Sequence, residues 1–203
     1  MLGLPRSTEV NRRVAKEKFY QNAALTPQTR ELIKDQIESV IWRNKLADST
    51  VGISAGENIN EIQIFEIQLR QRGLDNRVLS AIAKAIPYKI LFILIFGDEM
   101  QAWIEVSGVF YNTNWHSLED FTLKFEGLNL DTVYENLARQ ISGGRLGRDG
   151  NIEEAVVRDT RRQKLEREIA ALEKKIQREK QFNKQVELNS ELKKLRKELE
   201  VLR

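Results

Sequence analysis

The alternation of apolar and polar residues is clearest in residues 61–96, where it predicts a strand, a helix and a second strand. Between residues 59 and 69 most side chains are β-branched, aromatic or long aliphatic, and the apolar ones fall on both faces of an extended chain. A strand that is apolar on both faces lies inside a covered sheet. The helix is expected between Asp75, which can cap its first turn, and Pro87, which ends it. The apolar run from Ile90 to Phe96 then predicts a second buried strand.

The segments on either side extend this unit into an α/β (α+β) fold, in which flanking helices cover a mixed β-sheet. Together they are expected to form a globular domain over residues 1–142. Capping residues, alternating runs and helical spacing define these further elements. In chain order they are a helix from Thr26 to about Arg43, strands at Thr50–Ser54, Met100–Val106 and Gly108–Trp115, and an amphipathic helix at Leu130–Ile141.

A different pattern begins after the glycine-rich linker at residues 143–151. Residues 152–203 contain neither glycine nor proline, and their leucines and isoleucines recur in steps of three and four, the heptad spacing of a coiled coil. The seam is interrupted because Glu179 and Asn183 occupy positions where apolar residues are expected. The pattern therefore allows either one long helix or a hairpin that folds back near Lys180–Asn183. The seam residues are Leu165, Ile169, Leu172, Ile176, Leu192, Leu195, Leu199 and Leu202.

A seam this narrow, with charged residues around it, cannot be buried by a single helix. It needs a partner helix, which can come from a second copy of the chain, from the second half of the same segment or from another protein. We therefore expect this coiled-coil region to mediate oligomerisation, with the protein itself and/or a larger complex as its partner.

Composition limits the cellular setting and the available chemistry. The 203 residues carry a net charge of +3, of which residues 151–203 contribute +4 (15 Lys and Arg against 11 Asp and Glu) and residues 1–150 contribute −1 (18 against 19). The absence of cysteine excludes disulfides, thiolate metal sites and a cysteine nucleophile. The opening residues lack the apolar core of a signal peptide, and no apolar stretch reaches the length of a membrane span. We expect a soluble, cytoplasmic protein that does not associate with membranes.

Two groups of basic residues are candidates for contacts with DNA. One lies in residues 1–18, which are predicted to form an arm along the surface, and the other lies on one face of the C-terminal segment. Arginine and lysine neutralise the phosphate backbone without any sequence motif. An ordinary solvated surface is the alternative interpretation of both groups. The candidate contacts are Arg6, Arg12, Arg13, Lys174, Lys175 and Arg178.

Catalytic motifs are nearly absent from the sequence. Because His116 is the only histidine and cysteine is missing, neither a serine protease-like triad nor a zinc site is expected. The chain also lacks a phosphate-binding loop and a dinucleotide fingerprint. We therefore expect neither a cofactor nor a metal, and we favour a non-enzymatic role.

One enzymatic alternative survives, since the order of elements around residues 66–68 is that of the restriction-endonuclease-like nucleases. In those enzymes a central strand carries a carboxylate that holds Mg²⁺ and a lysine that helps to activate water. Here Glu66 would bind the metal, and Gln68 would replace the lysine. The competing interpretation places Glu66 near a strand end, paired with Arg70 or Arg72. The upstream acid has three candidates, Asp48, Glu57 and Glu61.

Several stretches resemble an uncharacterised bacterial family that is known only as a domain of unknown function. They are LGLPRSTEVN, EIQIFEIQLRQR, AIPYKILFILIF, QAWIEV, LNLDTVYENLARQISG and EKQFNKQVELNSELKKL. The resemblance covers essentially the whole chain and implies a genomic setting beside helicases and DNA methyltransferases, in restriction-like, antiphage gene clusters. It supplies no catalytic residues to transfer.

Together, these observations favour a non-enzymatic accessory or adaptor subunit that assembles through its coiled coil, within a bacterial DNA-processing or antiphage defence complex. A Mg²⁺-dependent nuclease with a degenerate Glu-x-Gln motif and a non-catalytic DNA-binding subunit are the two alternatives.

Overall fold

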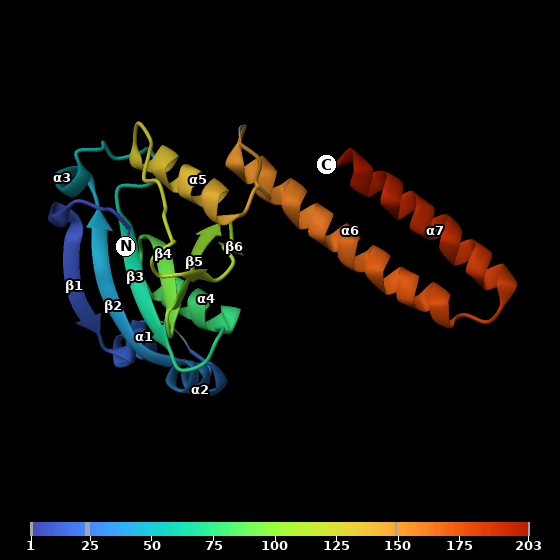
Figure 1. Ribbon diagram of the computed structural model, residues 1–203, viewed down its shortest axis with the longest axis horizontal. Helices are drawn as coiled ribbons and strands as arrows, with labels where there is room; N and C mark the ends of the chain where they lie inside the picture. The colour runs from blue at the N-terminus through green and yellow to red at the C-terminus, as the bar shows by residue number, and fades with distance from the viewer. Residues whose placement is uncertain (1, 23–24, 149, 203) are drawn as a thin grey trace. The chain divides into compact units, whose positions relative to one another are not determined.

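The computed structural model describes residues 2–22, 25–148 and 150–202, and the chain divides between Gly144 and Arg145 into two compact units. The first unit is a mixed β-sheet with flanking helices, and the second consists of two long helices that pack together (Figure 1). The predicted fold class is therefore confirmed. The division falls inside the glycine-rich segment of the sequence.

The first unit contains seven strands and five α-helices within the described residues, and the second unit contains two helices. In chain order the elements are η1 (Arg6–Thr8), β1 (Glu9–Val14), α1 (Lys16–Asn22), α2 (Pro27–Gln36), β2 (Ile37–Leu46), α3 (Asp48–Val51), β3 (Ile62–Leu69), α4 (Asn76–Ala85), β4 (Lys89–Phe96), β5 (Glu99–Val106), β6 (Val109–Asn112), β7 (His116–Ser117), α5 (Leu130–Ile141), α6 (Ile152–Arg178) and α7 (Phe182–Val201).

Strands β3 and β4 form the centre of the sheet, whose order is β1-β2-β3-β4-β5-β6, with β7 paired to β5. They pair in parallel and are connected through α4, whereas every other pair of neighbouring strands is antiparallel. Almost every residue of both strands is buried, because side chains on both faces are covered. The predicted strand-helix-strand-strand unit is thus confirmed, including the cap at Asp75, whose side chain accepts a hydrogen bond from the Arg77 backbone N–H.

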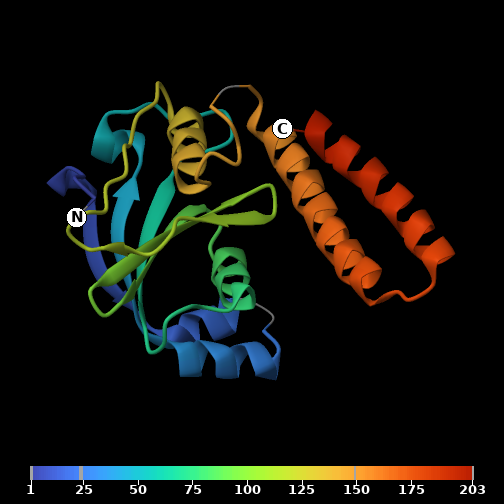
Figure 2. The same cartoon turned by 45° about the vertical axis from the view of Figure 1, so that its right-hand side comes forward.

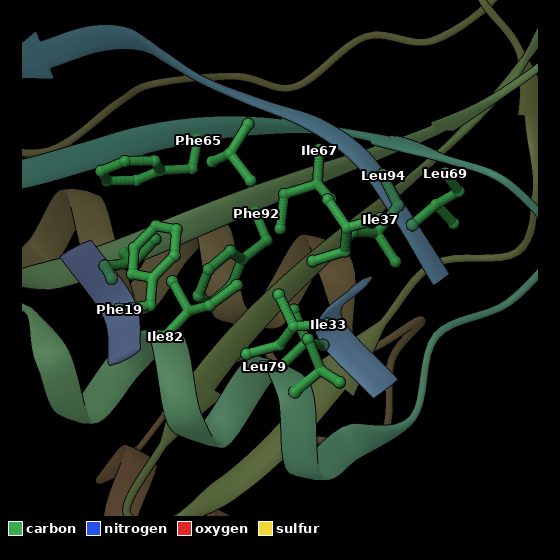
Figure 3. Packing of buried hydrophobic residues seen from close by; sticks show 13 residues of the cluster. Phe19, Ile33, Ile37, Phe65, Ile67, Leu69, Leu79, Ile82, Phe92 and Leu94 are labelled. Atoms are coloured by element: carbon green, nitrogen blue, oxygen red, sulfur yellow. The ribbon is translucent and has the colours of Figure 1, made fainter. Parts of the chain in front are cut away.

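One face of the sheet packs against α1, α2 and α4 to form the main apolar core. Figure 3 shows Phe19, Ile33 and Ile82 from these helices directed toward Phe65 and Phe92 of the two central strands. Figure 2 shows α1, α2 and α4 grouped together, with α5 apart from them, and α5 packs against β5 and β6. The sheet is therefore covered by two different sets of elements.

Two predictions about the N-terminal third were wrong. Helix α2 begins where Thr26 was expected to cap it, but it ends at Gln36, and the segment up to Leu46 is strand β2 rather than more helix. Residues 50–54 contain the end of the short helix α3 and an isolated bridge between Ser54 and Asn129, not a strand. The N-terminal arm contains an edge strand, β1, which pairs with β2.

The C-terminal segment is a hairpin, which settles the alternative that the sequence left open. Helix α6 ends at Arg178 and α7 begins at Phe182, with the two helices side by side (Figure 1). The carboxylate of Glu179 accepts hydrogen bonds from the backbone N–H groups of Lys180 and Gln181, both at 2.9 Å. These bonds lower the pKa of Glu179. All eight predicted seam residues pack together within one chain, joined by Leu188.

The loop between α3 and β3 is anchored by the carboxylate of Asp131, in the first turn of α5. Its two oxygens accept hydrogen bonds from the backbone N–H groups of Glu57, Asn58 and Ile59, at distances of 2.9, 3.2 and 2.8 Å. Gly56 lies directly against this carboxylate, so that a Cβ atom there would be 2.1 Å from Oδ1. A glycine is required at residue 56 because the carboxylate occupies the space of a side chain.

We predict that Gly56→Ala lowers the free energy of unfolding by about 2 kcal/mol, because the displaced carboxylate loses hydrogen bonds to the loop. Urea denaturation would measure the change. In an Asp131→Ala background the same glycine substitution should have little further effect, since the clash is gone. If Gly56→Ala lowers the free energy of unfolding equally in both backgrounds, a clash with the Asp131 carboxylate is not the cause.

Candidate functional site

Glu66 lies in the middle of β3 and forms an ion pair with Arg43 of β2. The Arg43 Nε and Nη2 atoms donate hydrogen bonds to the two carboxylate oxygens, at 2.6 and 3.0 Å. Glu66 is only 8% exposed. The predicted pairing with Arg70 or Arg72 near a strand end is therefore wrong, because Arg72 pairs with Glu99 and the Arg70 Nε donates to the Ile37 carbonyl.

Arg43 reaches Glu66 because the neighbouring strands are irregular at this point. Trp42 pairs with Phe65 and Asn44 pairs with Ile64, so Arg43 is an extra residue in β2, a β-bulge. Bulges redirect side chains and are common beside binding sites.

The neighbouring strand β1 is irregular at the same level. Its register shifts between Glu9 and Arg12, and Asn11 between them has a left-handed backbone with φ of 47°. The Asn11 side chain accepts a hydrogen bond of 3.2 Å from Arg43 Nη1 and donates one of 3.2 Å to Glu9. The two irregularities therefore build one polar cluster that extends from the edge strand to the central strand.

This polar cluster lies at the edge of a pocket of about 430 Å³. The apolar lining comes from two sources: the sheet face opposite the main core contributes four side chains, and the N-terminal residues contribute two leucines. Volumes of this size are typical of small-molecule sites. The lining residues are Leu2, Gly3, Leu4, Glu9, Asn11, Arg43, Asn44, Ile64, Glu66, Ile93, Ile95 and Met100.

The candidate nuclease residues are not brought together. Glu61 lines a second pocket, of about 260 Å³, where it pairs with Lys45 and accepts a hydrogen bond from Gln63. Both oxygens of Glu66 are held by Arg43, and Gln68 is half-buried two residues further along β3. In the part of the chain that the structure describes, no group of three or more His, Asp or Glu side chains is placed to hold a metal ion. Glu66 and Glu61 therefore lie in different pockets, and each is paired with a basic side chain of β2.

The second pocket contains a deeply buried phenol. The Tyr134 hydroxyl donates a 2.7 Å hydrogen bond to the Glu105 carbonyl, and the Lys89 ammonium lies 5.5 Å from the centre of the ring. Burial, with a smaller contribution from the charge of Glu105, raises the pKa of Tyr134 far above its usual range. The phenol is therefore neutral and acts as a hydrogen-bond donor that joins α5 to β5.

The hairpin turn between α6 and α7 carries a concentrated positive charge. Residues 174–184 contain five Lys and Arg against one Glu, a net charge of +4. Two large apolar side chains lie exposed among them, Phe182 at 74% and Val186 at 53%. They are four residues apart in α7 and thus share one face of the helix. We call residues 174–186 the hairpin tip.

The six predicted DNA-contacting residues are all exposed and belong to two different units. Arg6, Arg12 and Arg13 lie in or beside β1 of the first unit. Lys174, Lys175 and Arg178 lie in the hairpin tip, where they line a hollow of about 310 Å³ together with Ala171 and Glu179. Their contact with DNA stays a prediction.

Sequence reasoning missed Arg43 and Asn11 because it placed Arg43 at the end of a helix and Asn11 in an arm along the surface. The signal available for Arg43 was the β-branched and aromatic content around it, in Val40, Ile41 and Trp42, which favours a strand. A bulge leaves no comparable mark in the sequence. Phe182 and Val186 were missed because the heptad seam is interrupted at Glu179 and Asn183, next to them.

The class defined by this fold is a mixed α/β protein with a C-terminal helical hairpin. The chain matches the family described as "Domain of unknown function (DUF4391)" over residues 2–199, and it belongs to that family. No curated protein and no solved structure matches the chain. Among the described residues, no helix is long and apolar enough to cross a membrane.

We predict that Arg43→Met lowers the free energy of unfolding by about 2–4 kcal/mol, because it leaves the buried carboxylate of Glu66 without its partner. Glu66→Met should cost less, because Arg43 is partly exposed and keeps its hydrogen bond to Asn11. The double variant should be nearer to wild type than the sum of the two losses, since it removes both charges. Chemical denaturation of wild type, the two single variants and the double variant gives the coupling free energy between Arg43 and Glu66. Additive losses would show that the two side chains do not stabilise each other.

Proposed function

We propose that this protein is a non-enzymatic adaptor subunit that docks on a partner protein through the hairpin tip. The observation that carries this proposal is the pair of exposed apolar side chains, Phe182 and Val186, surrounded by positive charge. Exposed aromatic side chains act as anchors at protein interfaces when a partner buries them. The surrounding charge favours a partner whose surface is acidic around an apolar centre.

The closed seam supports docking through the tip rather than through a coiled coil between chains. Leu165, Leu172 and Leu192 are already buried by the facing helix of the same hairpin. A second copy could use the same seam only if the hairpin opened and exchanged α7 between chains. Docking on the outer surface of the hairpin does not require the hairpin to open. Assembly through the eight seam residues remains a prediction that needs such an exchange.

The resemblance to the bacterial family adds a genomic setting to this proposal. Family members are expected to be encoded beside helicases and DNA methyltransferases. The partner of the adaptor would then be such an enzyme, in a DNA-processing or antiphage defence complex. The adaptor would then hold its α/β unit at a fixed attachment point on that complex.

Binding of DNA by the same tip, without cleavage, is the second candidate. The hollow lined by Lys174, Lys175 and Arg178 favours it, because clustered cations bind phosphates. The two candidates differ in what Phe182 and Val186 do. Protein docking depends on their apolar surface, whereas phosphate binding depends on the cations around them and weakens steeply with salt.

The test compares the full chain carrying Phe182→Ser and Val186→Ser with wild type, by co-purification of the tagged protein with its partner from the native host. Loss of an aromatic anchor costs about 2 kcal/mol or more, so recovery of the partner should fall about 30-fold or more. The matched control is Val157→Ser with Val201→Ser. These residues are 69% and 81% exposed, on the same two helices but far from the tip in sequence.

Equal recovery with the tip variant and the control variant would contradict docking through the tip. Binding to a fluorescent DNA duplex should be measured in parallel at low and high salt. The DNA-binding candidate replaces the adaptor if two results are found together. The affinity for DNA falls steeply as salt rises, and the serine substitutions change neither DNA binding nor recovery of the partner.

A further inference from the structure

The pocket beside Arg43 and Glu66 is not used by docking through the hairpin tip. It belongs to the first unit, and its floor is the apolar sheet face formed by Ile64, Ile93 and Ile95, with Met100. A carboxylate as buried as that of Glu66 beside such a floor is costly, and an apolar pair of the same size is often more stable than an ion pair. The arrangement therefore points to binding rather than to stability alone.

The backbone of two strands is distorted to place this pair. The bulge at Arg43 and the left-handed conformation of Asn11 occur at the same level of the sheet, and both contribute side chains to the pocket. A left-handed backbone at a residue other than glycine costs free energy, and such strain gathers at binding sites. A cavity, a charge pair with a buried carboxylate and a left-handed backbone thus coincide.

The charges of the lining select the ligand. Two carboxylates, those of Glu9 and Glu66, line the pocket together with one guanidinium, that of Arg43, so the lining carries one net negative charge. Arg43 already donates three hydrogen bonds, two to Glu66 and one to Asn11. Each carboxylate oxygen can accept further hydrogen bonds, whereas an anion would meet the surplus negative charge. The polar end of the pocket suits a hydrogen-bond donor with a positive charge.

We propose that this pocket binds a small organic amine, in which an ammonium group contacts Glu66 and an apolar body lies on the isoleucines between the sheet and Leu2. The ammonium would donate to the outer lone pairs of the carboxylate and leave the bond to Arg43 in place. The apolar body fits a lining that is otherwise made of aliphatic side chains.

The test uses three probes of one shape with the full chain at neutral pH: benzylamine, benzyl alcohol and benzoate. Calorimetric titration should show benzylamine binding at least about tenfold more tightly than benzoate, with the alcohol between them, and about tenfold is 1.4 kcal/mol. The melting temperature should rise in the same order, because a ligand that binds only the folded chain stabilises it.

Two variants locate the binding. Glu66→Gln keeps the shape of the side chain but removes its charge, so it should weaken benzylamine binding about tenfold or more and leave the alcohol nearly unchanged. Because that variant also leaves Arg43 without its charge partner, Leu2→Ala provides a second test at the half-buried rim. It should weaken all three probes, whereas Leu128→Ala, at a residue that is 93% exposed, should weaken none.

Three results would overturn the proposal. Benzoate that binds as tightly as benzylamine would show that the pocket does not select positive charge. Benzylamine binding that survives both Glu66→Gln and Leu2→Ala would place the amine elsewhere, as an adventitious additive only. If none of the three probes binds, the pocket does not bind small organic amines and the proposal is wrong.

Discussion

Strands β3 and β4 carry apolar side chains on both faces, and the need to cover both faces shapes the rest of the first unit. Helices α1, α2 and α4 cover one face and bury Phe65 and Phe92. The other face is covered in part by α5, and beside the N-terminal residues it remains hollow. Because burial of apolar area is the main source of stability, the covered face holds the fold together. The incompletely covered face contains the pocket for which we propose a ligand.

The same requirement explains the hairpin. The heptad seam of the C-terminal segment is too narrow to be buried by one helix, and the chain supplies the partner helix itself through the turn at Glu179. Once the seam is closed, the hairpin has no need of a second copy for stability. Its exposed features, Phe182 and Val186 among the cations of the tip, are then available for a different partner. The seam that folds the hairpin and the tip that we propose for docking are therefore made of different residues.

Long, strongly patterned elements could be predicted from the sequence, and locally irregular ones could not. The unit from β3 to β5 and helix α5 were found because continuous apolar runs and helical spacing leave one interpretation. Strand β2 was taken for helix because Ile33, Ile37, Val40 and Ile41 also fit helical spacing, and only tertiary pairing decides between the two. Of the candidate site, Glu66 was predicted to lie on a strand, as a possible metal ligand. Its partner Arg43 was missed because a bulge depends on contacts between strands that no local pattern encodes.

The central claim is that the seam is closed within one chain, and cross-linking tests it most directly. Glu173 of α6 and Arg196 of α7 form an ion pair of 2.8 Å across the hairpin, and the chain contains no cysteine. The variant Glu173→Cys with Arg196→Cys, treated with a short thiol-specific cross-linker, should give a product with the mass of one chain at every protein concentration. A covalent dimer as the main product would show that the two helices pair between chains and would contradict the account.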